Sequence, residues 1–435
     1  MVNGPEPVAR CDSVVVAFDD ERLIANAGLL LTSTLSRRLG LERLVDETVD
    51  LGERAGAARP GRKVLSLCHA IAAGADSIDD TDVLRAGGSE ALLGHKAMAP
   101  STLGTFLRAF TFGHVRQLDR VLGEAIARAW TAGVGPGSGR LVVDVDSFIG
   151  EVHGYAKQGA DVIHTGERGY HPLLASRAET GEVLHVRLRK GRAASSRGVV
   201  RFAAELIARV RRAGASGEKL LRADSAFWNR KLIARLERAG WTYSISVRMQ
   251  FWVPEAIAAI PESAWRPLAD YPEDGEAEIA ETKAGGRRLV VRRTRLVGPQ
   301  AELWPDWRYH PFITNRTETL EVVEAEHRQH AVVETHIADL KDQALAHFPS
   351  ASFAANAAWT AIACLAHNLG RWTGVLGLAD PTPRTARTIR RWLIALPGRL
   401  TRTARRFTLH LPARWPWQLK FIEALSRIRA LPTAA

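Results

Sequence analysis

Cysteine is scarce in this chain. Its 435 residues include three cysteines, Cys11, Cys68 and Cys364, which lie far apart in unrelated surroundings. This number and spacing exclude a disulfide framework and a Cys-x2-Cys zinc site, so we expect reduced, buried thiols. The sequence also lacks an apolar run near the roughly 18 residues of a membrane span, and its first residues lack the pattern of a signal peptide. We therefore expect a cytoplasmic protein with no membrane partner.

Negative charge is also in short supply. Lys and Arg number 59 and Asp and Glu number 47, which gives a formal net charge of +12 and a pI near 10.1. A basic surface attracts polyanions and fits nucleic acid better than a neutral metabolite. The alternative explanations for this much arginine are simple solubility and a GC-rich genome. Between residues 380 and 429 the acids are Asp380 and Glu423, against Arg384, Arg387, Arg390, Arg391, Arg399, Arg402, Arg405, Arg406 and Arg414 among the bases.

Apolar periodicity divides the chain into several regions. Residues 1–135 show helical spacing, with Leu23, Ala27 and Leu30 on one stripe, and the glycine-rich segment 133–139 interrupts that pattern. Residues 250–310 alternate apolar and polar positions between Pro and Gly, which predicts an inserted, independent β-rich subdomain. An apolar helix is expected over residues 353–369. Strands are predicted at 141–146, 170–176, 182–188, 219–224 and 241–247, and helices at 195–213 and 227–239.

Two predicted strands and one helix carry candidate metal ligands. Asp146 and Asp224 each follow a short apolar run, and Glu334 lies seven residues before Lys341, which places these two side chains on one helical face. Three carboxylates supply the hard oxygen ligands that magnesium prefers, and could hold two ions. Asp224 alone is equally well explained as a helix N-cap. Asp144 shares the strand face of Asp146, so either residue could be the first ligand.

The order Asp, Asp, Glu, with the glutamate in His-x2-His-x3-Glu-x6-Lys, resembles the DDE insertion-sequence transposases, whose signature is Tyr-x2-Arg-x3-Glu-x6-Lys. His327 and His330 stand where that family has Tyr and Arg. The family's first aspartate commonly precedes Ser or Thr, which favours Asp146 because Ser147 follows it. Further blocks that match in order are Gly154–Gly159, Gly169–Leu174, Leu221–Phe227, Ala354–Asn356 and His367–Leu369, so the resemblance covers roughly residues 10 to 430.

The resemblance implies an α/β fold with an RNase H-like catalytic core, and the predicted order of strands and helices agrees with it. It implies a helical DNA-binding domain over residues 1–135, a core over 140–250 and 311–375, a β-rich insertion over 251–310 that contacts transposon-end DNA, and a basic helical region over 380–435. The implied activity is cut-and-paste transposition: terminal inverted repeats are bound, cleaved with Mg²⁺ or Mn²⁺, and joined to target DNA. The resemblance also implies a homodimer on double-stranded DNA and a nucleoid-associated location.

Further residues are candidate DNA contacts. The resemblance implies that Lys341 touches a phosphate near the cut site and that Trp228 stacks on a flipped base, although a core aromatic is the more ordinary role for Trp228. His336 and His347 complete a group of four nearby histidines, but their spacing does not favour zinc. The remaining DNA-binding candidates are His327, His330, Arg328, and Arg189, Lys190 and Arg192 of a basic loop.

Two other functions fit the same residues. Another RNase H-like nuclease or resolvase would share the carboxylates and the metals but would need neither inverted repeats nor strand transfer. A catalytically inactive, transposase-derived repressor would bind DNA without cutting it, and the histidines in place of Tyr and Arg favour this alternative. The presence of all three carboxylates argues against it.

Overall fold

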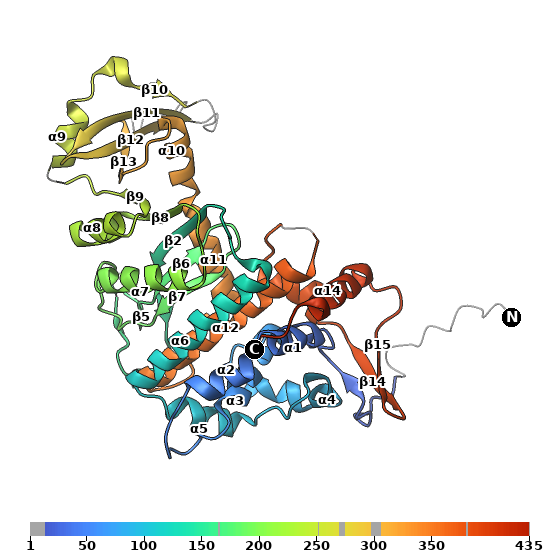
Figure 1. Cartoon of the computed structure of the whole chain (residues 1–435). Helices are drawn as coiled ribbons and strands as arrows, with labels where there is room; N and C mark the ends of the chain where they lie inside the picture. Colours follow the sequence, from blue (N-terminus) through green and yellow to red (C-terminus); the bar gives the residue numbers. More distant parts are fainter. Residues whose placement is uncertain are drawn as a thin grey trace.

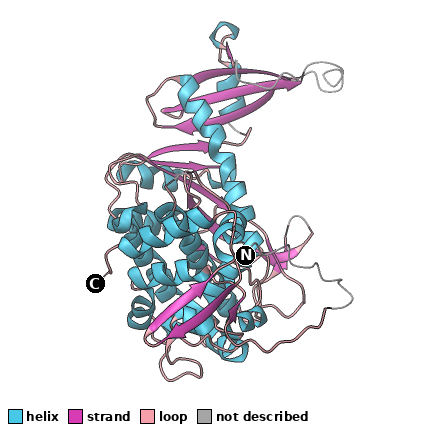
Figure 2. Cartoon of the chain, turned by 90° about the vertical axis from the view of Figure 1, so that its right-hand side faces the viewer, coloured by secondary structure: helices cyan, strands magenta, loops and turns pink. Residues whose placement is uncertain are grey.

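The computed structural model describes residues 14–163, 166–250, 252–268, 275–296, 306–379 and 382–434. A long mixed sheet runs through one end of the molecule and a helical body forms the other (Figures 1 and 2). Cys68 and Cys364 are free and buried, as expected, and Cys11 lies outside the described residues. No helix of the described residues is long and apolar enough to cross a membrane.

The sheet has nine strands in the order β10-β11-β12-β13-β9-β8-β2-β6-β7. Strand β2 is parallel to β8 and antiparallel to β6, β8 is parallel to β9, and β6 is antiparallel to β7. The strands are β2 (Leu141–Ser147), β6 (Leu173–Arg177), β7 (Val183–Arg187), β8 (Lys219–Ala223), β9 (Thr242–Ser246), β10 (Arg266–Pro267), β11 (Gly275–Ala284), β12 (Arg287–Leu296) and β13 (Arg308–Thr314). The strands and helices expected between residues 141 and 247 are confirmed in type and order, with one exception. The strand expected over residues 170–176 is split, because Tyr170 ends a strand of a separate small sheet and Leu173 begins β6.

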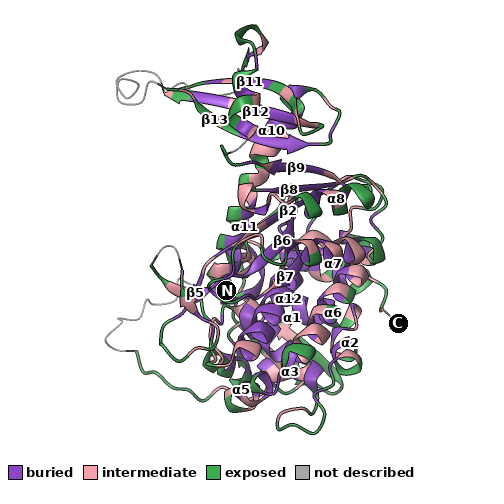
Figure 3. Cartoon of the chain, turned by 90° about the vertical axis from the view of Figure 1, so that its left-hand side faces the viewer, coloured by how far each residue is buried: buried purple, intermediate pink, exposed green. Residues whose placement is uncertain are grey.

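Helices cover both faces of the β2-β6-β7-β8-β9 part of the sheet. Helices α7 (Val199–Arg212) and α8 (Arg230–Arg238) pack together and contact β7 and β9, while α11 (Val332–Leu340) and α12 (Phe353–Gly377) contact β2 and β7. Figures 1 and 3 place α11 on the opposite side of the sheet from α7 and α8. Because helices pack on both faces of the sheet, both faces of β2 and β8 are buried. This burial explains why the two strands are nearly continuous apolar runs.

The segment expected to form an independent β-rich subdomain is instead joined to the sheet. Its strands extend the sheet because β13 pairs with β9, with Phe312 opposite Ser246 and Thr314 opposite Ser244. Helices α9 (Trp252–Ala258) and α10 (Leu320–Arg328) pack on β11. The segment is still β-rich and projects as a lobe at the far end of the molecule from α3 and α5 (Figure 3). Pattern alone could not reveal the pairing, because β9 and β13 lie far apart in sequence.

The helical body is built around α12, whose apolar residues are buried on all sides. It packs against α3, α6 and α14 (Gln418–Ala430), and its Trp359 and Trp372 side chains are fully buried. Thr111 and His114 form a capping box at the start of α6. Leu23, expected in the first helix, lies instead in β1 (Leu23–Ile24). The other helices are α1 (Leu29–Arg38), α2 (Leu41–Thr48), α3 (Pro60–Ala73), α4 (Ser89–Leu93), α5 (Pro100–Arg108) and α6 (Phe112–Ala129).

The region after residue 380 is not wholly helical, in contrast to expectation. Helix α13 (Ala386–Ile389) is followed by a hairpin of β14 (Gly398–Thr403) and β15 (Arg406–His410), and then by α14 (Gln418–Ala430). Strand β14 pairs with β1, and α14 packs against α1 and α12, so this region completes the helical body. A second small sheet contains β3 (Gly150–Glu151), β4 (Asp161–Val162) and β5 (Arg168–Tyr170).

Candidate active site

The three predicted metal ligands lie where two parallel strands end and one helix begins. Val145 of β2 is opposite Ala223 of β8, so the next residues, Asp146 and Asp224, emerge side by side at one edge of the sheet. Glu334 occupies the first turn of α11, which contacts β2. The carboxylate of Asp146 accepts from the Ser147 amide at 2.6 Å, and Asp224 accepts from the Ala226 amide at 3.0 Å as the N-cap of a short 3-10 turn.

Negative charge is uncompensated at this edge. Burial raises the pKa of Asp146 to about 6, helped by the nearby charges of Asp224 and Glu334, and the Ser147 amide and His330 offset only part of this rise. Asp224 and Glu334 are exposed, and neither they nor Asp146 form an ion pair with any described residue. Burial and acidic neighbours both disfavour the charged form of Asp146, and a bound divalent cation would stabilise that form.

Asp144 has a different environment from Asp146, although both lie on the same face of β2. It is fully buried, and its two oxygens accept from the Arg222 guanidinium at 2.8 Å each. The Nδ1 atom of His330 lies 2.7 Å from Asp144 Oδ1. Because its oxygens are engaged by these partners, Asp144 acts as a support, and Asp146 is the stronger candidate for a metal ligand on this strand.

The two histidines of the helical motif are held by the protein. Serine hydroxyls lie at both ring nitrogens of His327, with Ser244 at 2.7 Å from Nδ1 and Ser246 at 3.0 Å from Nε2, and the ring stacks on Phe312. Burial, followed by the charges of His330 and two arginines, lowers the pKa of His327 to about 3, so the ring is neutral. His327, His330, Arg328 and Glu334 line one cleft of about 410 Å³ between the β9–β13 strands and the α10–α11 region.

Lys341 and Trp228 each lie near a residue that follows one of the two aspartates in the chain. Lys341, in the turn that continues α11, places its Nζ 5.7 Å from the ring centre of Phe148, directly after β2. Trp228 lines a pocket of about 250 Å³ with Trp252, Ser225 and Ala226, the two residues that follow Asp224. The ring of Trp228 is partly buried, and its indole N–H has no hydrogen-bond partner among the described residues.

The basic loop after β7 contains one arginine with a structural role. Arg189 is buried, and its guanidinium donates to the carbonyl oxygens of His171, Ala194, Ser195 and Arg197 at 2.8–3.0 Å. These bonds from Nε and Nη1 hold the loop and give Arg189 a structural role, so its contact with a DNA phosphate stays a prediction. Lys190 and Arg192 are exposed, and Arg192 pairs with Asp161 at 2.8 Å.

The histidines His336 and His347 do not join His327 and His330 in a zinc site. The Nδ1 atom of His336 lies 2.9 Å from the Ser176 hydroxyl, and that of His347 lies 3.1 Å from an Asp76 carboxylate oxygen. Within the described ranges, one group of potential ligands has all its atoms within 4.8 Å of one another, and it contains none of these histidines.

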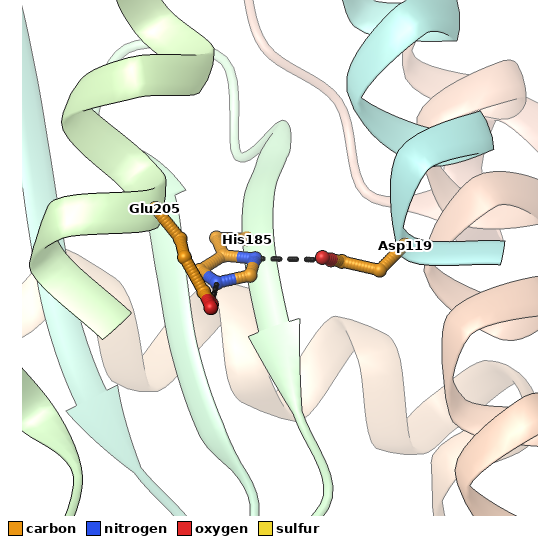
Figure 4. A group of neighbouring side chains, drawn as sticks. All are labelled: Asp119, His185 and Glu205. Atoms are coloured by element: carbon orange, nitrogen blue, oxygen red, sulfur yellow. Dashed lines mark hydrogen bonds and ion pairs between the residues drawn. The ribbon is translucent and has the colours of Figure 1, made fainter. Parts of the chain in front are cut away.

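That group consists of Asp119, His185 and Glu205, which sequence reasoning missed (Figure 4). Asp119 belongs to α6, His185 to β7 and Glu205 to α7. The His185 ring is fully buried between the two carboxylates, with Nδ1 3.2 Å from Asp119 and Nε2 3.1 Å from Glu205. No sequence signal points to it, because the three residues have no motif spacing and meet only through packing of the helical body on the sheet.

Arginines neutralise this second cluster. Arg209 donates to Asp119 at 2.7 Å, and Arg116 and Arg187 pair with Glu205. Although burial alone would raise the pKa of Glu205, the hydrogen bond from His185 and the charge of Arg187 hold it at about 2, and the pKa of Asp119 is likewise held far below its usual range by His185 and Arg209. Asp119 and Glu205 are already paired with arginines. The cluster is therefore a network of ion pairs, here called the Asp119–His185–Glu205 hub, that joins the helical body to the sheet.

Comparisons with known proteins identify a family for the chain. The model of the family described as transposase DDE domain, group 1, matches residues 6–433. Among solved structures, a cryo-EM synaptic complex of piggyBac transposase with hairpin DNA is similar at 14% identity and a TM-score of 0.45, covering 86% of this chain and 80% of that chain. A likeness this low adds no argument. A search of curated proteins finds no significant match.

Proposed function

This chain belongs to the group 1 family of DDE transposases, and we propose that it cleaves DNA at transposon ends and joins the freed 3′ hydroxyl to target DNA. The observation that carries the proposal is the uncompensated carboxylate cluster of Asp146, Asp224 and Glu334. The strand order β7-β6-β2-β8-β9, with β6 antiparallel to its neighbours, supports an RNase H-like core around it. The division into terminal, core and insertion domains is part of the same proposal.

The three carboxylates would hold the catalytic Mg²⁺, or Mn²⁺ in its place. Their carboxylate oxygens do not all lie within 4.8 Å of one another. Such close grouping is not required when two ions share the three ligands. When bound, the metal would make the attacking water or hydroxyl more acidic and neutralise charge on the phosphate. Asp146 and Asp224 come from rigid strand ends, so the ligands are positioned before DNA arrives.

Surrounding residues have proposed roles in holding the DNA. Lys341 lies beside the end of β2 and would contact a phosphate near the cut. The Arg222–Asp144 pair holds His330 by its Nδ1, which leaves Nε2 for DNA at the edge of the cleft. Trp228 would stack on an unpaired base in its pocket. His327, Arg328, Lys190 and Arg192 would line the path of the strand, and two copies of the chain would act together on paired ends.

The DNA that flanks the gene provides the first test. Matched inverted repeats with short direct repeats outside them would define the ends, and a duplex that carries one such end is then incubated with the full chain and Mg²⁺ or Mn²⁺. We expect metal-dependent cleavage at the repeat boundary and joining of the 3′ end to a second duplex. Cleavage without dependence on the repeats would favour another nuclease, and binding without cleavage in either metal would favour a repressor.

A further inference from the structure

Arginines of the sheet lobe are already paired within the protein. Along β12, Arg288 binds Glu281, Arg293 binds Glu278 and Arg295 binds Glu276, all through contacts of 2.7 Å or less. At the lobe's inner end Arg287 pairs with Glu237. An arginine paired with a carboxylate has little net charge with which to attract a phosphate. The lobe is therefore poorly suited to sequence-independent, electrostatic binding of DNA.

The β14–β15 hairpin has the opposite character. Arg402, Arg405 and Arg406 are exposed at its tip, and in the described part of the chain none of them forms an ion pair. The Arg402 guanidinium lies over the ring of Phe407, which is itself 58% exposed. From residue 382 to residue 434 the sequence contains one acid, Glu423, and that residue pairs with Arg427 on α14.

The base of this hairpin is firmly mounted. Strand β14 pairs with β1, and Gly398 packs so closely on Ala27 that an added Cβ would lie 2.7 Å from the Ala27 Cβ. After β15, Trp415 donates to the Trp392 carbonyl at 3.1 Å, and Trp417 stacks on Trp392. The two ends of the hairpin are thus attached to the helical body while its basic tip is exposed at one side (Figure 1).

We propose that the β14–β15 hairpin is an arm that lies along a groove of duplex DNA and contacts phosphates through Arg402, Arg405 and Arg406. This inference rests on the proposed function. It places most of the sequence-independent DNA binding on the hairpin rather than on the sheet lobe. A two-stranded β-ribbon fits the major groove, and arginines without acidic partners replace the counterions of the phosphates. The arm holds DNA of any sequence, because its charged side chains contact the backbone.

The test compares two triple variants of the full chain that lose the same charge. Arg402→Gln, Arg405→Gln and Arg406→Gln alter the arm, and Arg287→Gln, Arg288→Gln and Arg295→Gln alter the lobe as the matched control. Point substitutions are preferred to truncation, because α14 packs into the helical body. Affinity for an end duplex and an unrelated duplex is measured across a salt series without divalent metal, and thermal unfolding checks that each variant folds.

We expect the arm variant to reduce the slope of log affinity against log salt by about 2 to 3, since each phosphate contact contributes about 0.9. Its affinity should fall by the same factor for both duplexes, while the lobe variant changes the slope by less than about 1. An unchanged slope in the arm variant, equal losses in both variants, or a loss confined to the end duplex would each overturn the proposal. A parent chain that binds neither duplex would instead contradict the proposed function, and the arm with it.

Discussion

Two acidic clusters in this molecule invite the same interpretation and have opposite electrostatics. Asp119 and Glu205 lie close enough to His185 to share one metal ion, yet arginines already pair with both acids. Asp146, Asp224 and Glu334 are less tightly grouped, and no described cation pairs with them. The pKa of Glu205 is held at about 2 by its partners, whereas burial and neighbouring acids raise the pKa of Asp146 to about 6.

We expect charge balance to be a better guide to the metal site in this molecule than ligand proximity. A divalent ion placed beside Asp119 would meet Arg209 at the same carboxylate, so its attraction to the acid would be opposed by a fixed positive charge. At the other cluster the negative charges repel one another until a cation arrives. We therefore propose that the looser cluster is catalytic and that the tighter one supports the fold.

The largest expected difference between the clusters is in DNA cleavage. Glu334→Gln and Glu205→Gln each remove one negative charge and preserve side-chain size. We expect Glu334→Gln to reduce metal-dependent cleavage of end DNA to below about a thousandth of the parental rate, because the carboxylates act as one unit. Asp146→Asn and Asp224→Asn should behave in the same way, with DNA binding retained. Glu205→Gln should cut at close to the parental rate, and equal losses in both glutamine variants would contradict the assignment.

Stability should show the reverse order. Asp119→Asn leaves the Arg209 guanidinium buried without its ion-pair partner, which we expect to lower the free energy of unfolding by about 3 kcal/mol. Asp224→Asn, at an exposed N-cap, should change it by less than about 1 kcal/mol. Denaturant unfolding of the two variants measures both values. A larger loss in Asp224→Asn would mean that the roles are exchanged.

A third acid gives a smaller, pH-dependent effect. Glu182 is fully buried and accepts hydrogen bonds from the indoles of Trp130 and Trp372, and burial raises its pKa to about 7 from an ordinary value of 4.5. Its contribution to stability is therefore complete below about pH 4.5 and is lost as the pH rises through about 7. Glu182→Gln should be more stable than the parent at pH 8, by about 2 kcal/mol, and equal to it near pH 5. Parallel pH profiles of unfolding would contradict this.

Much of the core and its carboxylates could be predicted from the sequence, because local patterns determine them. Apolar runs such as Leu141–Val143 are typical of strands that are buried on both faces of a sheet. The order of the motifs along the chain relates Asp146 to Asp224 and Glu334. Their close approach follows from the parallel register of β2 and β8, which sequence pattern alone does not specify.

Features set by long-range packing could not be predicted. Arg189 looks like an exposed basic residue until the loop folds around its guanidinium. The β14–β15 hairpin has Ala404 at its two-residue turn, with a left-handed φ of 54° that Gly or Asn usually adopts. Because neither Gly nor Asn is present, the usual sequence signal of a hairpin is missing. The Asp119–His185–Glu205 hub depends on how α6 docks against β7.

Direct measurement of Mn²⁺ binding tests the central claim. Metal-free full-length parent, Glu334→Gln and Glu205→Gln are each titrated with Mn²⁺ in the presence of end DNA, and bound ion is followed by electron paramagnetic resonance. The account predicts that Glu334→Gln loses tight Mn²⁺ binding while Glu205→Gln binds as the parent does. Loss of Mn²⁺ binding in Glu205→Gln, with normal binding in Glu334→Gln, would place the metal at the Asp119–His185–Glu205 hub and contradict it.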